Sequence, residues 1–387
     1  TECERSTIDR ATSSVDPGHH IQLGDGKRIR YSKLTDAKLK DSRLGVKQML
    51  KVIQVGVGGY GGSWLPTVMD SQRAQHVALV DLSPDHLQRA QEVTGLPQSA
   101  CFSDLEQVLM TVEADALLCI VPPAHHESVI KSALSAGLHV LSEKPIADTV
   151  QSAHRILQSV SQTDRIFMIS QKARFHPWVR QFRQIVHSGQ LGQISHVTHY
   201  FRAPYYSWGE FRHQMQDPLY IEMSIHHFDL LRALLGCDPV QVWSTSWNTL
   251  YSSFAGDITG LAHFVMDNGW PVTYHADAIA SGDMTDWYGE IRAVGETGTL
   301  TMIYPDLYIA RKGANHNDRQ APQEPVMEVT SPQDGQLAAF HEFLDAIEEN
   351  RIPESSGQDN LKSLAMVFGA IDASRDQQVK QITDYLL

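Results

Sequence analysis

Residues 50–61 read LKVIQVGVGGYG, an apolar, β-branched run that passes directly into a cluster of glycines. The first six residues have the composition of a short buried strand. Gly56, Gly58 and Gly61 follow a G-x-G-x-x-G spacing, and the sequence after them is compatible with a helix. A second apolar run follows at 76–80. The segment therefore predicts a strand, a glycine turn, a helix and a second strand.

Glycines at this spacing have a physical purpose when they lie between a strand and a helix. Gly56 permits a tight turn, Gly58 lets the backbone approach a pyrophosphate, and Gly61 lets the helix pack closely on the strand. The start of the helix offers unpaired N–H groups to phosphates. We therefore predict a dinucleotide site that also includes Gly59 and Tyr60. A glycine-rich turn without a ligand is the alternative.

Asp81 ends the second strand, 20 residues after Gly61. Its carboxylate can accept hydrogen bonds from the adenosine ribose hydroxyls and would repel a 2′-phosphate. No arginine follows it in residues 82–85. The sequence therefore predicts NAD as the cofactor, with NADP disfavoured.

Strands and helices continue to alternate up to about residue 170. Further strands are expected at 116–121, 139–141 and 166–169, and helices at 84–94, 103–112, 126–136 and 148–162. Strands that alternate with helices of about a dozen residues indicate βαβ units and a parallel sheet. We therefore predict an α/β fold whose first domain, 49–170, is a Rossmann dinucleotide-binding domain.

Strands dominate after residue 171. They are expected at 194–203, 239–248, 257–267, 270–280 and 288–304, with helices at 176–188, 219–235, 334–350 and 358–375. Asp267-Asn268-Gly269 lies between two alternating runs and predicts a hairpin. Residues 311–325 have the composition of a loop. We predict that 171–387 is an α+β substrate-binding domain with a large, mostly antiparallel open sheet, and that its last helices pack back on the Rossmann domain.

Two short motifs follow strands of the predicted parallel sheet, Val121-Pro122-Pro123 and Glu143-Lys144-Pro145. Ligands of open α/β sheets bind at the carboxyl ends of the strands. A lysine there can contact both a cofactor and a substrate hydroxyl, and its charge would favour an alcohol losing its proton. Lys144 is therefore a catalytic candidate, with a surface lysine in a turn as the alternative.

The predicted helix at 219–235 places Glu222, His226 and Asp229 on one face, because they are spaced by four and three residues. A histidine between carboxylates is a candidate general acid or base, since its ordinary pKa is about 6.5. A zinc site and a structural histidine are the two alternatives. The zinc interpretation has few well-placed ligands and no cysteine, so we predict no metal.

Aromatic and arginine side chains near these motifs are weaker candidates. Arg174 follows the last parallel strand, Trp208 precedes the His226 helix, and His227 is next to His226. Such side chains serve sugar-binding clefts through stacking and directed hydrogen bonds. We predict that these three contact the substrate. A packed loop with a solvated arginine is the alternative.

The composition narrows the classes of partner. The 387 residues carry a formal net charge of −13, which argues against nucleic acid as a partner. No run approaches 18 apolar residues, so we predict no membrane span. The four cysteines are far apart and form no CxxC pair, which favours reduced thiols and a cytoplasmic location.

Residues 1–48 differ from the rest of the chain. Their formal net charge is +3, whereas that of residues 49–387 is −16. They also lack any long helical or alternating apolar pattern. We interpret them either as a tag-like or upstream-translated extension or as an arm that wraps a neighbouring subunit.

Together these motifs resemble the Gfo/Idh/MocA family of NAD(P)-dependent sugar and cyclitol oxidoreductases. The resemblance extends from Met49 nearly to the end of the chain. It rests on the glycine motif, Pro122 with His126, Glu143-Lys144-Pro145, Arg174-Phe175, Glu222-x-x-x-His226-x-x-Asp229 and residues 293–300.

The resemblance implies roles for particular residues. Lys144 would be the catalytic lysine and His226 the acid/base histidine, while Pro122, His126 and Glu143 would belong to the cofactor site. Glu222 stands where many members have aspartate. The resemblance also implies a homo-oligomer, a dimer or tetramer, joined through the open sheet.

The sequence thus predicts an NAD-dependent dehydrogenase that oxidises a secondary alcohol of a sugar, sugar derivative or cyclitol, with Glu222 orienting His226. Two other functions stay open. One is a glycoside-processing enzyme that breaks a glycosidic bond by transient oxidation with bound NAD. The other is a catalytically silent sugar-sensing regulator.

Overall fold

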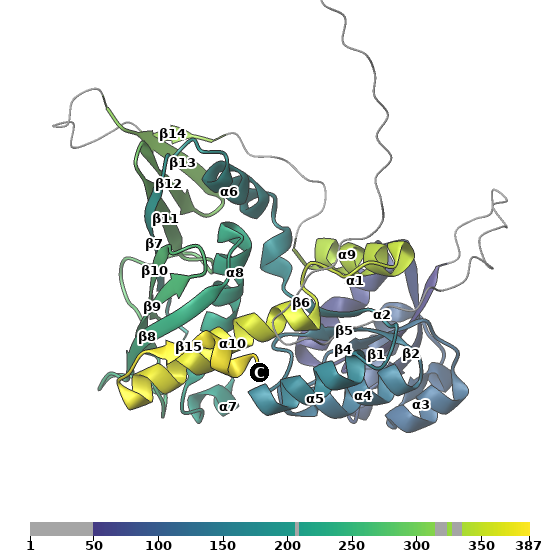
Figure 1. Ribbon diagram of the computed structural model, residues 1–387. Coiled ribbons are helices and arrows are strands. Elements are labelled where there is room, and N and C mark those ends of the chain that lie inside the picture. Colours follow the sequence, from purple (N-terminus) through teal and green to yellow (C-terminus); the bar gives the residue numbers. More distant parts are fainter. Residues whose placement is uncertain (1–48, 206–208, 314–322, 327–334) are drawn as a thin grey trace, which may run out of the picture. The chain divides into compact units, whose positions relative to one another are not determined.

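The first sheet contains six parallel strands in the order β3-β2-β1-β4-β5-β6 (Figure 1). This computed structural model describes residues 49–205, 209–313, 323–326 and 335–387. The strands are β1 Leu50–Val55, β2 Ala74–Val80, β3 Cys101–Phe102, β4 Ala116–Cys119, β5 His139–Glu143 and β6 Phe167–Ser170. This order confirms the Rossmann-type sheet that the sequence predicts. Both interpretations of residues 1–48 fall outside the described residues.

Helices cover both faces of this sheet. They are α1 Trp64–Asp70, α2 Pro84–Thr94, α3 Leu105–Thr111, α4 His126–Ser135 and α5 Val150–Val160, with short 3₁₀ turns η1 Gly59–Ser63, η2 Gln98–Ala100 and η3 Pro123–His125. Alternate residues of β1 pack on opposite sides: Val52 lies in one core with Trp64, and Ile53 lies in another with Ile130. A strand buried on both faces reads as a continuous apolar run, which explains the sequence of β1.

The second sheet has nine strands in the order β14-β13-β12-β11-β7-β10-β9-β8-β15. They are β7 Ile194–Arg202, β8 Pro239–Trp247, β9 Thr259–Met266, β10 Pro271–Asp277, β11 Glu290–Gly295, β12 Gly298–Ile303, β13 Asp306–Arg311, β14 Gln323–Pro325 and β15 Lys380–Gln381. All pairs are antiparallel except β7 with β10. The predicted mostly antiparallel sheet is therefore confirmed. The predicted loop at 311–325 is wrong at its end, because β14 pairs with β13 there.

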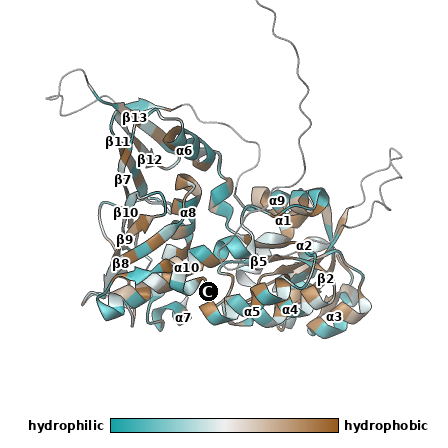
Figure 2. Ribbon diagram, in the orientation of Figure 1, coloured by the Kyte–Doolittle hydropathy of each residue, from teal (hydrophilic) through white to brown (hydrophobic). Residues whose placement is uncertain are grey.

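One face of the second sheet packs against helices. These are α6 Pro177–His187, α8 Ile225–Leu235 and α10 Gly357–Asp376, while α7 Glu210–His213 precedes a single turn, η5 Leu219–Ser224. Phe182, Phe228 and Met366 of the three long helices share one core with Phe264 and Tyr274 of the sheet. Hydrophilic and hydrophobic residues alternate along the strands and helices (Figure 2), as expected for elements with one buried face.

The last helices contact elements of the first sheet. α9, Gly335–Glu349, contacts α1, β6 and the turn η4 Lys172–Phe175. α10 contacts α5 and β6 as well as α8 and β8. Within the described ranges, none of the helices is both long and apolar enough to cross a membrane.

Candidate functional site

The candidate site lies at the carboxyl ends of β5 and β6. In the parallel register Glu143 of β5 pairs with Ser170 of β6. Lys144 follows β5 directly, and Lys172 begins η4 two residues after β6. Adjacent parallel strands end at the same edge of a sheet, so two lysines come to one place from residues 28 apart in sequence. This is where the sequence predicted a ligand.

The glycine turn after β1 is shaped by close backbone contacts. Gly56 has a φ of +86°, and a Cβ on it would lie 2.1 Å from the carbonyl oxygen of Ile120. A Cβ on Gly61 would lie 2.3 Å from the carbonyl oxygen of Gly56. Only glycine fits at either position, because both contacts are to backbone. A Cβ on Gly58 would strike the imidazole of His86, 2.1 Å from its Nδ1.

Asp81 joins the glycine turn to the end of β2. Its Oδ2 accepts hydrogen bonds from the N–H groups of Val57 and Gly58 at 2.9 and 3.2 Å. Its Oδ1 accepts from the N–H of Ser83 at 2.9 Å and lies 3.1 Å from His86 Nδ1. Partial burial alone would raise the pKa of Asp81, but these hydrogen bonds outweigh it and lower the pKa. The carboxylate is therefore ionised and fixed beside the turn.

Lys144 and Glu222 form an ion pair at the strand edge. The Nζ of Lys144 lies 3.8 Å from Oε2 of Glu222, and the same oxygen accepts a hydrogen bond from Nε of Arg212 at 2.9 Å. Burial would raise the pKa of Glu222, but the charges of Lys144 and Arg212 outweigh that effect and lower it. The carboxylate therefore stays ionised between two cations.

His226, the first histidine of α8, is partly exposed and packs edge to face on Trp287, with ring centroids 5.4 Å apart. Within the described ranges its ring makes no hydrogen bond to another residue. Its pKa lies well below the usual value because the ring is enclosed, and because the charges of Lys144 and Lys172 oppose its protonation. His226 is therefore a neutral imidazole that can accept a proton.

The predicted pairing of Glu222 with His226 is wrong. Residues Leu219–Ser224 form a π-helical turn, and the α-helix begins only at Ile225. In a π-turn the backbone bonds i to i+5, so residues four apart no longer lie above one another. The carboxylate of Glu222 pairs with Lys144 and Arg212, and no hydrogen bond joins it to His226 in the described part of the chain.

The predicted pairing of Asp229 with His226 is also wrong, and so is the predicted substrate contact of Arg174. Nε and one terminal nitrogen of Arg174 each donate to an oxygen of Asp229 at 2.6 Å. The same terminal nitrogen lies 2.6 Å from an oxygen of Asp359 on α10. Arg174 is only 4% exposed. Its guanidinium is paired with Asp229 of α8 and Asp359 of α10 and is buried, so it is not available to a substrate.

Two further predictions need correction. His227 is 1% exposed, with Nδ1 2.8 Å from the hydroxyl of Tyr274 and Nε2 2.9 Å from the carbonyl of Trp287. Its ring supports the segment that carries Trp287 and does not contact a substrate. His126 is fully buried between the carbonyls of Val121 and Pro145, at 2.9 Å from each. It therefore connects the loops that follow β4 and β5, and its ring is too buried to contact a cofactor.

The remaining predicted residues lie around the strand edge. Glu143 is 8% exposed, and its Oε1 accepts a hydrogen bond from the indole of Trp64 at 2.9 Å. Burial raises the pKa of Glu143. Tyr60 is 48% exposed on the glycine turn, and Pro122 precedes η3. Trp208 lies outside the described residues.

Sequence reasoning missed Lys172 and Trp287. Lys172 directly precedes Ala173 and Arg174, and only the strand order makes it a neighbour of Lys144. Its Nζ lies 5.7 Å from the ring centroid of Tyr60. Trp287 lies between β10 and β11, about 60 residues after His226, and nothing local in the sequence signals their contact.

Two family models match this chain. An oxidoreductase family with an NAD-binding Rossmann fold, GFO_IDH_MocA, matches residues 50–171, and the C-terminal α/β domain of the same family matches residues 183–382. The chain belongs to the Gfo/Idh/MocA family. The resemblance drawn from the motifs is thereby confirmed, and NAD is the cofactor that the family's first domain binds.

Individual relatives are distant. The chain is 27% identical to the uncharacterized protein y4oX of Sinorhizobium fredii over 347 residues, 87% of this chain and 96% of that one. It is 28% identical to an inositol 2-dehydrogenase of Corynebacterium glutamicum over 198 residues, 51% of this chain and 57% of that one. A levoglucosan dehydrogenase structure in complex with NADH and levoglucosan has 16% identity and a TM-score of 0.74, and the match covers 87% of this chain and 100% of that one.

The residues of this Gfo/Idh/MocA chain fit NAD. The turn at Gly56 and Gly61 leaves no room for a side chain, and a Cβ on Gly59 would meet no atom within 4 Å. The helical segment from Gly59 offers its first N–H groups to phosphates. Asp81 keeps its carboxylate 13% exposed at the end of β2. Among the described side chains, no group of three or more His, Cys, Asp or Glu could hold a metal ion.

Proposed function

We propose that this enzyme oxidises a secondary alcohol of a sugar, sugar derivative or cyclitol to a ketone with NAD. The observation that carries the proposal is the arrangement at the strand edge. There Lys144 is held by Glu222 and acts electrostatically on His226, a neutral imidazole with no hydrogen-bond partner among the described residues. A cation and a free base close together are what removal of an alcohol proton requires.

The reaction divides between the cofactor and this chain. NAD, when bound, accepts the hydride, which carries two electrons from the C–H bond of the alcohol carbon. His226 accepts the hydroxyl proton, and Lys144 stabilises the negative charge that develops on the oxygen as the C=O bond forms. Glu222 and Arg212 hold the ammonium of Lys144 in place. Glycines 56, 58 and 61, Asp81, Glu143 and Tyr60 would line the cofactor site.

Two relatives support this substrate class. The Corynebacterium protein is named an inositol 2-dehydrogenase, and levoglucosan is bound in the structurally similar dehydrogenase. Trp287 at His226 gives this chain an aromatic surface beside the proposed base. Aromatic rings pack on the apolar faces of sugars and cyclitols. A cytoplasmic location, predicted from the cysteine pattern, is part of this proposal.

The test is to mix the protein with NAD and a panel of sugars and inositols and to follow the absorbance of NADH. We expect NADH to form with at least one polyol, and Lys144→Met to abolish the signal. The matched control is Lys131→Met, an exposed lysine on α4. Silence with every polyol, and with ketosugars and NADH, would refute the proposal. Cleavage of an aryl glycoside without net NADH would instead indicate the glycoside-processing alternative.

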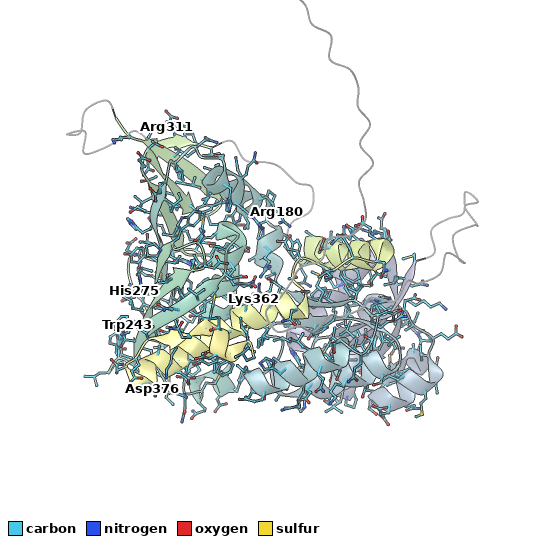
Figure 3. The ribbon with its side chains drawn as sticks, viewed as in Figure 1. Arg180, Trp243, His275, Arg311, Lys362 and Asp376 are labelled. Carbon is cyan, nitrogen blue, oxygen red and sulfur yellow. The ribbon has the colours of Figure 1, made fainter. Side chains whose placement is uncertain are left out.

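We further propose that two copies of the chain associate through the second sheet. The face opposite α8 and α10 carries Trp243, Trp247 and Tyr200, each close to 40% exposed, and His275 stacks on Trp247. Trp243 and His275 are labelled on the second sheet in Figure 3. Exposed aromatic residues on a broad sheet are typical of interfaces. Trp243→Glu should lower the mass measured by light scattering. An unchanged mass would contradict this interface.

A further inference from the structure

The lysines at the strand edge are not balanced by carboxylates. Glu222 is the carboxylate paired with Lys144, and it is shared with Arg212. Lys172 has no carboxylate within ion-pair distance among the described residues, and its described contact is the ring of Tyr60. Lys172 is therefore the cation of this group that has no carboxylate partner among the described residues.

The second basic group is placed by the fold. Glu143 pairs with Ser170, so the residues that follow β5 and β6 leave the sheet side by side. η4 also contacts α8, which carries His226. The charge of Lys172 reaches that imidazole, because it contributes to the low pKa of His226 together with Lys144. Lys172 therefore lies at the same strand edge as Lys144, with its Nζ near the ring of Tyr60 and its turn in contact with the helix that carries His226.

Unpaired positive charge in a partly enclosed site is costly and attracts a ligand of opposite charge. A neutral polyol would leave the ammonium of Lys172 uncompensated. A carboxylate or phosphate on the substrate would compensate it through a charge-assisted hydrogen bond. We propose that the substrate is an anionic polyol, a sugar or cyclitol that carries a carboxylate or phosphate group, and that Lys172 binds this group. This inference rests on the proposed function.

The test compares matched pairs of substrates in the NAD assay: D-glucuronate with D-glucose, D-galacturonate with D-galactose, and myo-inositol 1-phosphate with myo-inositol. The first two pairs report a carboxylate and the third a phosphate. A charge-assisted hydrogen bond contributes about 1.5–3 kcal/mol, so kcat/KM should favour the anion in at least one pair by roughly 10- to 100-fold. Equal rates within every pair, or a preference for the neutral member, would overturn the inference.

Lysine variants show which residue binds the anionic group of the substrate. Lys172→Met should remove the preference for the anion, because kcat/KM should fall more for the anion than for its neutral partner, and Lys172→Arg should keep the preference. Lys131→Met should behave as wild type. The affinity for NADH, followed by its fluorescence, should be unchanged in Lys172→Met. A weakened NADH affinity with an intact anion preference would assign Lys172 to the cofactor phosphates and overturn its proposed role.

Binding separates this inference from the proposed reaction. The holoenzyme with NADH is titrated with the same six compounds while its melting temperature is measured. Stabilisation by an anion but not by its neutral partner, without turnover of either, would support the charge preference and refute the dehydrogenation. Turnover of neutral polyols alone would support the dehydrogenation and refute the anionic substrate. No shift and no turnover with any compound would refute both.

Discussion

Two groups of charged side chains lie next to each other along η4, η5 and α8, and their pairing differs sharply. In the arginine network, Arg174, Asp229, Arg232 and Asp359, carboxylate oxygens and guanidinium nitrogens lie as close as 2.6 Å, and the two arginines are at most 5% exposed. In the lysine group, Lys144, Lys172, Glu222 and His226, the lysine–carboxylate distance is 3.8 Å and the imidazole makes no described hydrogen bond.

The difference separates structural from reactive groups. The arginine network satisfies its charges internally and fixes α8 and α10 to η4, so it has nothing left for a ligand. The lysine group keeps charge and a free base available at the strand edge. A residue's type does not distinguish the two roles, because both groups combine cations with carboxylates. The two roles are distinguished by how many ion-pair and hydrogen-bond partners each side chain already has within the protein.

The largest expected effect breaks the arginine network. Arg174→Met leaves the buried Asp229 and the partly buried Asp359 each with one fewer partner, and removal of one member of a buried pair costs about 3–5 kcal/mol. Urea unfolding should show this loss in the free energy of unfolding. The control is Arg180→Met on α6, whose side chain is 47% exposed and pairs with Glu354, and which should cost less than about 1 kcal/mol (Figure 3). Equal losses of free energy of unfolding in the two variants would contradict the structural role of the arginine network.

An intermediate effect concerns acid stability and His227. Burial lowers the pKa of His227 to about 4, whereas an unfolded histidine titrates near 6.5. Between pH 6.5 and pH 4 the histidine binds a proton in the unfolded state but stays neutral in the folded state, so the free energy of unfolding falls as the pH falls. The loss in the free energy of unfolding that His227 causes is negligible at pH 7 and amounts to about 2 kcal/mol at pH 5.

His227→Gln should remove this loss, so that its stability falls less between pH 7 and pH 5 than that of the wild type. Urea unfolding at the two pH values measures the difference. His196→Gln, at an exposed position of β7, is the control and should keep the wild-type dependence. The same dependence in His227→Gln as in the wild type would show that His227 is not held neutral by the framework.

The smallest effect tests Glu222 as a positioning residue. Glu222→Gln removes the charge that holds Lys144, and we expect kcat/KM to fall about tenfold, equivalent to about 1.4 kcal/mol. Glu222→Asp keeps the carboxylate and should restore most of the activity. A merely structural role would predict similar losses in both variants. Similar losses would therefore place Glu222 with the arginine network.

The strands and the glycine turn could be predicted because their causes are local. The apolar run of β1 and the positive φ of Gly56 are properties of a few adjacent residues. The position of Lys144 could also be predicted, since the end of a parallel strand is visible in the sequence. Arg174 could not be assigned, because Asp359 is supplied by α10 from 185 residues away. Lys172 was missed for the same reason, since its meaning depends on strand order.

The pairing of Glu222 with His226 failed for a different reason. The four-residue spacing assumes 3.6 residues per turn throughout, and one wide turn before α8 breaks that assumption. Nothing in LYIEMS marks a π-turn, because its residues are compatible with an ordinary helix. The error was in the helical register, and the roles of Glu222 and His226 in the reaction stay predictions.

That wide turn makes the site sensitive to chain length. Each residue of an α-helix advances about 100° around the axis, so deleting one residue within Leu219–Ser224 would restore a regular helix and rotate everything before it by about that angle. Glu222 would leave Lys144, although every named side chain would still be present. Relatives that differ here by a single deletion could therefore share all the landmark residues and still build a different pocket.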